Sequence, residues 1–232
     1  MKSVMTVDLE YDWETRESKN LAAVPKLLKF FSKHGIRATF FVLGSLAEKN
    51  KKLIKEIAKK HEVASHSYDH VDLSQLNENH TAVQVLKSKR VFDSMGIEVK
   101  GFRAPYFKTN KFLNKILSAA GFEYDSSKFG NKVSFNGLAE IPVPSFAPFV
   151  KCGLPYYRLL YPCSKVFSPK HLFYIHPHEF IPVSKGRSTM PFLLKILGKR
   201  NSGEKAWEIF EQFINKNKVK WVSCGDFLKN ER

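Results

Sequence analysis

The chain has 232 residues, of which 43% are hydrophobic and 26% are charged, with only 12 glycines and 11 prolines. This composition is typical of a globular protein and excludes disordered, collagenous and low-complexity chains. Lysine and arginine number 38 against 22 acidic residues, so the formal net charge of +16 predicts attraction to a polyanion. The three cysteines are far apart in the sequence, which argues against a disulfide scaffold and a cysteine-rich zinc module.

Strand-like and helix-like patterns alternate along the chain. The first strand is predicted at residues 3–7, and a helix follows whose apolar residues recur at i, i+3, i+4 and i+7 from Val24 and which ends at Gly35. The later predicted strands are 38–43, 63–65, 99–102, 122–124, 140–143, 172–175 and 220–222, and the later helices cover 46–57, 78–95 and 112–120. Alternating units of this kind indicate a parallel α/β sheet wrapped by helices, and their number favours a closed or nearly closed barrel.

Two further segments are irregular or ambiguous. Residues 142–169 are rich in proline and aromatic residues, break the alternation, and are expected to lie over the barrel mouth. Residues 191–200 are apolar and basic, and they fit either an outer barrel helix or a segment lying in the headgroup region of an anionic membrane.

The sequence also predicts where the protein works. The N-terminal residues reach Asp8 and Glu10 before any apolar run long enough for a signal peptide, and no segment approaches the roughly 20 apolar residues of a membrane span. We therefore expect a cytoplasmic protein. Its basic charge adds the expectation of peripheral contact with the inner face of an anionic cytoplasmic membrane.

Polar residues follow five of the predicted strands, at the barrel end where α/β barrels build their active sites. These strand ends carry Asp8 and Glu10, residues 66–70, residues 103–106, residues 125–127 and residues 176–179. Because these groups are titratable or can bind metal, they are the candidate catalytic residues.

His66 and His70 are four positions apart. If the chain enters a helical turn there, both imidazoles lie on one face and can reach one ion at about 2.0 to 2.1 Å. Glu10 or Asp8 can add a carboxylate to complete a site of two histidines and one acid. A lone pair of histidines at this spacing is more often two surface residues, but the polar ends of the other four strands favour the metal site.

The motifs at the strand ends resemble those of the polysaccharide deacetylases, the NodB-homology or carbohydrate esterase family, in family order. Residues 6–10 match the first motif loosely, 66–70 match His-Ser/Thr-x-x-His, 103–106 match Arg-x-Pro-Tyr, 125–127 match Asp-Ser-Ser, and His176 matches the last histidine. The resemblance implies a single domain over residues 1–232 folded as a distorted (β/α) barrel with about seven parallel strands. It also implies a hydrolase that removes an acyl group, as an N-deacetylase or deformylase, from an amino sugar of a polysaccharide, glycan or lipid-linked precursor.

The resemblance further implies a catalytic role for the matched residues. Asp8 would be the general base, oriented by Arg103, and His176 the general acid, steadied by Asp125. His66 would hold a divalent metal together with its partner histidine at position 70. Zinc is the expected ion, although cobalt, iron and nickel suit the same ligands.

The first motif departs from the family, because the usual second aspartate is Leu9. Successive side chains of a strand point to opposite faces, so Asp8 and Glu10 share one face and Leu9 turns away. We expect Glu10 to take the place of the missing ligand. The Asp-x-Glu form resembles a subgroup in which some relatives work without a metal, so both metal-dependent and metal-free hydrolysis are open at this point.

Four more residues are expected to contact substrate. The resemblance assigns the backbone N–H of Tyr106, beside Pro105, to the oxyanion. His178 and Glu179 follow His176 directly and either support its imidazole or help to close the barrel mouth.

Charge and location favour an enzyme that works on a sugar attached to a phosphorylated lipid, or on another anionic glycan precursor. Two other functions fit the sequence less well. One is a metal-independent hydrolase of a small cyclic amide or ureide, and the other is a non-catalytic binder of an anionic glycan or nucleic acid. The set of acid, base and ligand candidates argues against the binder, and no nucleic-acid-binding motif is present, so no nucleic-acid partner is expected.

Overall fold

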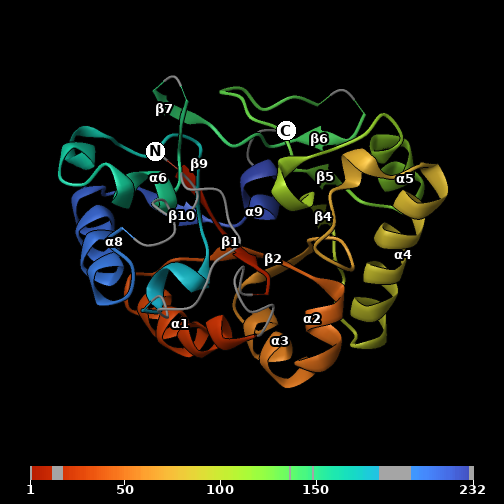
Figure 1. Cartoon of the computed structure of the whole chain (residues 1–232), viewed down its shortest axis with the longest axis horizontal. Helices are drawn as coiled ribbons and strands as arrows, with labels where there is room; N and C mark the ends of the chain where they lie inside the picture. Colours follow the sequence, from red (N-terminus) through yellow and green to blue (C-terminus); the bar gives the residue numbers. More distant parts are fainter. Residues whose placement is uncertain (1, 12–17, 136, 148, 183–199, 230–232) are drawn as a thin grey trace.

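The computed structural model describes residues 2–11, 18–135, 137–147, 149–182 and 200–229. Its strands form one curved parallel sheet in the order β10-β1-β2-β3-β4-β5-β6, with β9 also paired to β1 (Figure 1). These strands are β1 (Lys2–Leu9), β2 (Ala38–Val42), β3 (Glu62–Ser65), β4 (Gly101–Phe102), β5 (Tyr124–Asp125), β6 (Ala139–Glu140), β9 (Leu172–Ile175) and β10 (Lys220–Val222). The predicted distorted parallel barrel of about seven strands is confirmed, and this sheet has eight strands among the described residues.

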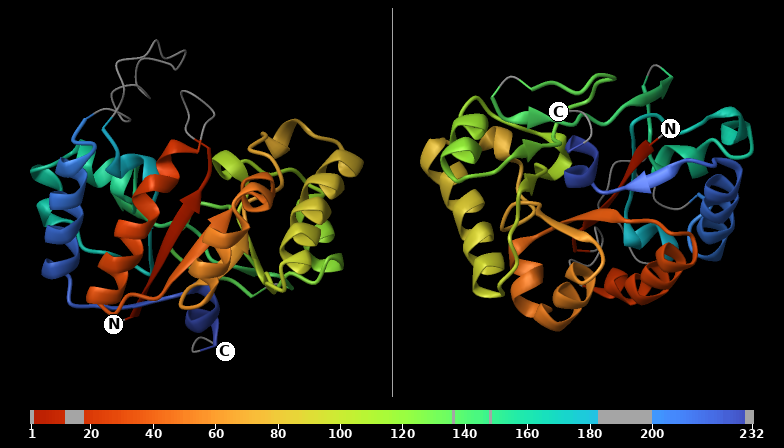
Figure 2. Two further views of the ribbon diagram at one scale, coloured as in Figure 1. Left: turned by 90° about the horizontal axis from the view of Figure 1, so that it is seen from below. Right: turned by 180° about the vertical axis from the view of Figure 1, so that it is seen from behind.

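Helices form an outer arc around the strands in both views of Figure 2. The helices are α1 (Val24–Lys33), α2 (Gly44–Lys49), α3 (Lys51–Ala58), α4 (Glu78–Ser94), α5 (Leu113–Ala119), α6 (Leu154–Leu159), α8 (Glu204–Lys216) and α9 (Cys224–Leu228). Short 3-10 turns are η1 (Lys19–Ala23), η2 (Leu73–Gln75), η3 (Pro105–Phe107), η4 (Cys163–Val166) and η5 (Pro177–Phe180). Within the described ranges, no helix has the length and apolar character needed to cross a membrane.

The helix predicted at 46–57 is two helices. Asn50 interrupts it, with φ −127° and ψ 38°, and its side-chain amide donates to the carbonyl oxygen of Leu46 at 2.9 Å. Asparagine competes with the helix for backbone hydrogen bonds in this way, so α2 ends and α3 starts at the next residue.

The alternation of β1 decides which of its side chains reach the barrel interior. Val7 and Leu9 pack in the apolar layer shared with the helices, whereas Val4 packs in a second cluster formed by strand residues and α9. Thr6 and Asp8 follow Val4 on the same face, as the period of a strand requires. Leu9, which stands where the family has its second aspartate, is fully buried in the outer apolar layer. It therefore does not face the site.

Part of the irregular segment lies in the barrel wall. The N–H of Cys152 donates to the carbonyl oxygen of Pro144 at 2.7 Å, and the N–H of Tyr174 in β9 donates to the carbonyl oxygen of Cys152 at 3.3 Å. Gly153 bridges to Tyr174, and a Cβ at position 153 would lie 2.3 Å from the tyrosine ring. The expectation that the segment lies over the mouth is therefore wrong for these residues, which link the region after β6 to β9.

The same segment carries a hairpin and α6. The hairpin strands are β7 (Ser145–Ala147) and β8 (Val150–Lys151), which pair antiparallel. The ring of Phe146 stacks on Phe167 with centroids 4.9 Å apart and contacts Phe173 of β9 at 6.3 Å. Residues 191–199, for which the sequence left a helix and a membrane-surface segment open, lie outside the described residues.

Candidate active site

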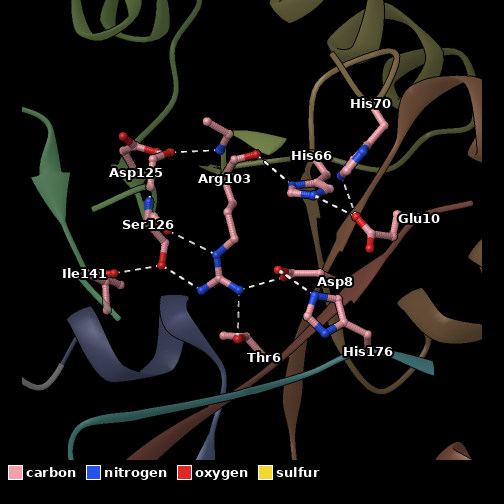
Figure 3. A network of polar contacts seen from close by, with 12 residues as sticks. Thr6, Asp8, Glu10, His66, His70, Arg103, Asp125, Ser126, Ile141 and His176 are labelled. Carbon is pink, nitrogen blue, oxygen red and sulfur yellow. Dashed lines mark hydrogen bonds and ion pairs between the residues drawn. The ribbon is translucent and has the colours of Figure 1, made fainter. Parts of the chain in front are cut away.

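Polar side chains from several strand ends converge at one end of the barrel (Figure 3). Asp8 and Glu10 follow along β1, His66 comes after β3, Arg103 after β4, and His176 after β9. Each of these five residues is at most 8% exposed. Because the strands are parallel, their carboxyl ends bring together residues that are far apart in the sequence.

Glu10, His66 and His70 form a cluster of metal-ligand type, with donor atoms that all lie within 4.8 Å of one another. Oε2 of Glu10 is 2.5 Å from Nε2 of His70 and 3.7 Å from Nε2 of His66. Nδ1 of His66 donates to the carbonyl oxygen of Arg103 at 2.8 Å, which turns Nε2 toward the cluster as the nitrogen that could bind a cation. Two imidazoles and one carboxylate, with the first ring fixed in this way, fit a divalent cation.

The two histidines do not share a helical turn, so the condition under which their spacing alone would bring them together is not met. Ser67 has a left-handed backbone with φ 72°, and the carbonyl oxygens of Ser67 and Tyr68 accept the N–H groups of Gly44 and Ser45 at 2.9 Å each. The start of α2 therefore shapes the loop that brings His70 back to the first histidine. A non-glycine residue held in this conformation costs energy and is more frequent at functional sites.

Two histidines control the ionisation of Glu10. Burial alone would raise the pKa of this carboxyl, but the charge of His70 and the hydrogen bonds from His66 and His70 hold its pKa well below the usual range. Asn20 of η1 donates through Nδ2 to the backbone carbonyl oxygen of Glu10 and is itself buried. Glu10 is therefore an ionised, backbone-anchored ligand candidate.

Arg103 holds Asp8. Its Nη1 is 2.6 Å from Oδ1 of Asp8 and donates to Oγ1 of Thr6 at 2.9 Å. Nε donates to the carbonyl oxygen of Ser126 at 3.0 Å, and Nη2 donates to Oγ of Ser126 at 2.8 Å. The guanidinium is fully buried, so these contacts fix both its plane and the carboxylate that it orients.

His176 faces Asp8 from β9, with Nε2 3.9 Å from Oδ2 of the carboxylate. The other ring nitrogen, Nδ1, is 3.1 Å from Oε1 of Glu179, which also accepts the backbone N–H of His176 at 2.8 Å. Burial would lower the pKa of this imidazole, but the hydrogen bond to Glu179 and the charges of Glu10 and Asp8 outweigh it and raise the pKa to about 9. At neutral pH His176 is protonated and can donate a proton.

A sequence profile of the polysaccharide deacetylases matches residues 4–124. The chain belongs to the polysaccharide deacetylase family. Over 92 residues it is 39% identical to the peptidoglycan-N-acetylglucosamine deacetylase PgdA of Listeria monocytogenes, and this match covers 39% of the chain but only 20% of PgdA.

Two solved structures with the polysaccharide deacetylase fold are similar over nearly the whole chain. The peptidoglycan deacetylase PdaC from Bacillus subtilis has 15% identity and a TM-score of 0.63, covering 99% of this chain and 91% of PdaC. A pseudoenzyme of the CE4 family from Bacillus anthracis has 16% identity and a TM-score of 0.58, covering 98% of this chain and 66% of that chain. Because one of these proteins is a pseudoenzyme, activity has to be argued from the side chains of the site.

Asp125, in the fourth motif of the family, was expected to steady His176, but its hydrogen bonds go to two serines instead. Its Oδ1 accepts the N–H of Ser126 at 2.8 Å and the hydroxyl of Ser127 at 2.5 Å, and its buried Oδ2 has no hydrogen-bond partner. Burial and the neighbouring Glu140 raise the pKa of Asp125 to about 7. Asp125 thus supports the serine that holds Arg103, whereas Glu179 is the carboxylate beside His176.

The third motif of the family forms the rim. Pro105 is buried, while Tyr106 is 53% exposed and its ring lies edge-on to His70 with centroids 4.3 Å apart. Tyr106 has φ 57°, the left-handed conformation that a tyrosine adopts rarely. The predicted contact of its backbone N–H with an oxyanion stays a prediction.

His178 lies beside the general-acid candidate, with its ring stacked on His176 at 4.9 Å. Burial and the neighbouring charge of His176 lower the pKa of His178 to about 4, so His178 is neutral at physiological pH. The two histidines therefore have opposite protonation states. Sequence reasoning missed Asn20 and Arg158, which contact Glu10 and Glu179, because neither residue lies in a motif.

Proposed function

We propose that this chain is a hydrolase that removes the acyl group from an N-acylated amino sugar of a glycan, most simply as an N-deacetylase. The observation that carries the proposal is the pairing of Asp8 with His176 at 3.9 Å beside the Glu10, His66 and His70 cluster. Amide hydrolysis requires a base, an acid and an activated water at one carbonyl, and this arrangement offers groups for all three.

Glu10, His66 and His70 are the residues that would hold the divalent cation, with zinc as the first candidate. A cation bound there supplies Lewis-acid activation of water and of the acyl carbonyl. The ionised state of Glu10 and the fixed tautomer of His66 both favour ligation. The chemistry of the donor set therefore supports a metal-dependent reaction over the metal-free alternative.

Asp8 and His176 would divide the proton transfers between them. Asp8, held by Arg103, accepts a proton from the attacking water. His176, which is protonated at neutral pH, donates a proton to the departing amine. The sugar leaves with a free amino group and the acyl group leaves as a carboxylate.

The names of relatives support the substrate class. PgdA is named for peptidoglycan N-acetylglucosamine, and PdaC for peptidoglycan. We extend the class of N-acetylated amino-sugar glycans to this chain.

The direct test incubates the zinc-loaded protein with oligomers of N-acetylglucosamine and with N-formylated analogues, and follows acetate or formate release together with the mass of the sugar. If the loaded protein releases neither acid from any of these sugars, the proposal fails.

The activity should fall at alkaline pH because of His176. An acid with a pKa of about 9 is protonated at neutral pH and loses its proton as the pH rises through 9. We expect kcat/KM to decrease about tenfold for each pH unit above this value. Initial rates measured from neutral to strongly alkaline pH check this. A decrease centred near 6.5, the ordinary pKa of histidine, would contradict the assignment.

Peripheral contact with an anionic membrane and a lipid-linked substrate extend the proposal, and the net charge of +16 supports them. We expect the protein to sediment with vesicles of anionic phosphatidylglycerol, to remain in solution with zwitterionic phosphatidylcholine, and to dissociate as the salt concentration rises. Equal sedimentation with both lipids, or none with either, would remove the case for membrane contact while leaving the deacetylase proposal intact.

A further inference from the structure

Glu179 is a buried carboxylate that contacts the general-acid candidate, His176, directly. Its side chain has no exposed surface. Oε1 accepts two hydrogen bonds from His176, one from the backbone N–H at 2.8 Å and one from Nδ1 at 3.1 Å. One contact holds the backbone of His176 and the other holds its ring. The opposite ring nitrogen, Nε2, therefore faces Asp8.

Arg158 of α6 holds the other oxygen of this carboxylate. Its Nε donates to Oε2 of Glu179 at 3.0 Å, and its side chain is only 1% exposed. Nη1 of Arg158 donates to the carbonyl oxygen of Arg200, and the carbonyl oxygen of Arg158 accepts from Nδ2 of Asn201 at 2.7 Å. The arginine is therefore anchored on both its backbone and its guanidinium.

The energetics of burial explain why both partners are needed. A buried carboxylate without a partner would be costly, and it would gain a proton instead of remaining charged. Arg158 offsets this cost and is among the groups that hold the pKa of Glu179 below its usual range despite burial. A charged Glu179 can then accept the hydrogen bond from Nδ1–H of His176, which leaves Nε2 as the nitrogen that exchanges a proton at the reaction centre.

We infer that Arg158 and Glu179 are positioning residues that act as a relay on His176, taking the place that the family resemblance gave to Asp125. The inference rests on the proposed function for its catalytic meaning. Its geometric basis is the run of contacts from Arg158 through Glu179 to His176. Asp125 cannot serve instead, because its Oδ1 is taken by two serines and its Oδ2 has no hydrogen-bond partner.

The relay can be tested on the protein without substrate. The Cε1–H signal of His176 in an NMR titration of the full chain reports the pKa of this imidazole, with a His176→Gln variant to assign the signal. The ionisable groups that face His176 are Glu179 and His178 from η5, Asp8 from β1, Glu10 directly after β1, and Tyr174 from β9.

We expect Glu179→Gln to lower the pKa of His176 by about one to three units, because it removes the nearest negative charge and keeps the side-chain shape. Arg158→Gln should lower it by less, and Arg158→Lys should restore part of the loss. Asp125→Asn should shift it by no more than about half a unit, because its oxygens do not contact the ring. Arg90→Gln, an exposed arginine on α4, is the matched control for a lost guanidinium.

Kinetics give the second readout. Glu179→Gln should lower kcat by about 10- to 100-fold, leave KM nearly unchanged, and move the alkaline limb of the pH profile to lower pH. If Arg158→Gln does not fold, because it leaves Glu179 buried without its cation, the double variant Arg158→Gln with Glu179→Gln removes both charges and should fold. Urea unfolding of each variant separates loss of stability from loss of the relay.

The outcomes separate the inference from the proposed function. A His176 pKa that stays the same in Glu179→Gln, or that moves more in Asp125→Asn than in Glu179→Gln, overturns the relay. If the pKa moves as expected but no N-acylated sugar is hydrolysed, the relay stands and the proposed function fails. If the wild type hydrolyses an N-acylated sugar but the pKa of His176 is unchanged in Glu179→Gln, the proposed function stands and the relay fails.

Discussion

Asp8→Asn should lower kcat/KM for an N-acetylated sugar by about 10²- to 10⁴-fold, the usual contribution of a general base. Asparagine keeps the shape of the side chain but cannot take a proton from water. It also leaves Arg103 with a buried positive charge and one carboxylate fewer, although Thr6 and Ser126 still accept from the guanidinium. Breaking a buried pair of this kind costs about 3 to 5 kcal/mol, so the folded fraction has to be measured along with the rate.

Asp72→Asn is the matched control for this variant. Oδ2 of Asp72 is 2.6 Å from Nζ of Lys108, the same separation as between Asp8 and Arg103, but Asp72 comes directly before η2 and both side chains of this pair reach solvent, with 24% and 56% exposed. An exposed pair contributes little to stability, and Asp72 does not contact the site, so activity should stay within about twofold of wild type. Initial rates at saturating and limiting sugar, together with urea unfolding, test both variants. Asp8→Asn with more than a tenth of the wild-type rate would exclude Asp8 as the base.

The arrangement of β1 could be predicted from the sequence because it depends on local geometry. A strand alternates its faces, so Asp8 and Glu10 had to share a side with Thr6, and Leu9 had to leave it. The structure gives this arrangement: Asp8 and Thr6 both contact Arg103 inside the barrel, while Leu9 packs with the outer apolar layer. Here the departure from the family motif was informative, since an apolar residue at position 9 left Glu10 as the next inward-facing carboxylate.

The loop that carries the two histidines could not be predicted from spacing alone. A separation of four suggested a helical turn, but Ser67 adopts φ 72° and its carbonyl oxygen accepts the N–H of Gly44. That partner is more than 20 residues away and belongs to the start of α2, so only the assembled barrel fixes the loop. The histidines still meet, with ring centroids 5.5 Å apart, through tertiary contacts and not through a local period.

The partner of His176 was mistaken for a related reason. Asp125 and Glu179 both follow strands that end at the site, and sequence order does not show which carboxylate lies beside Nδ1. Position decides it, because Glu179 sits on the turn that His176 begins, three residues away, whereas Asp125 lies on β5 and turns to its own serines. Arg158 was beyond prediction, since it comes from an irregular segment and contacts Glu179 across 21 residues of sequence.

Glu10→Ala should remove tight metal binding. The wild type is expected to bind one equivalent of zinc, and loss of even an outer partner of a metal ligand typically costs 10- to 100-fold in affinity, so loss of a ligand should cost at least about 100-fold. Equilibrium dialysis with metal analysis measures this directly and does not depend on knowing the substrate. Because ligands must be deprotonated to bind a cation, binding should also weaken in acid.

Glu48→Ala is the matched control, because Glu48 is an exposed glutamate of α2 whose Oε2 accepts the hydroxyl of Tyr68 at 2.9 Å, near the histidine loop but outside the cluster. It should bind zinc as wild type does. Chelation should abolish acyl release from the wild type, and added zinc or cobalt should restore it, whereas Glu10→Ala should need far more metal for the same rate. Full activity in metal-free wild type would refute the ligand assignment and favour the metal-free hydrolase, in which Asp8, Arg103 and His176 would have to activate water without a cation. The two outcomes therefore decide whether Glu10 replaces the missing aspartate of the family as a ligand or only balances the charge of His70.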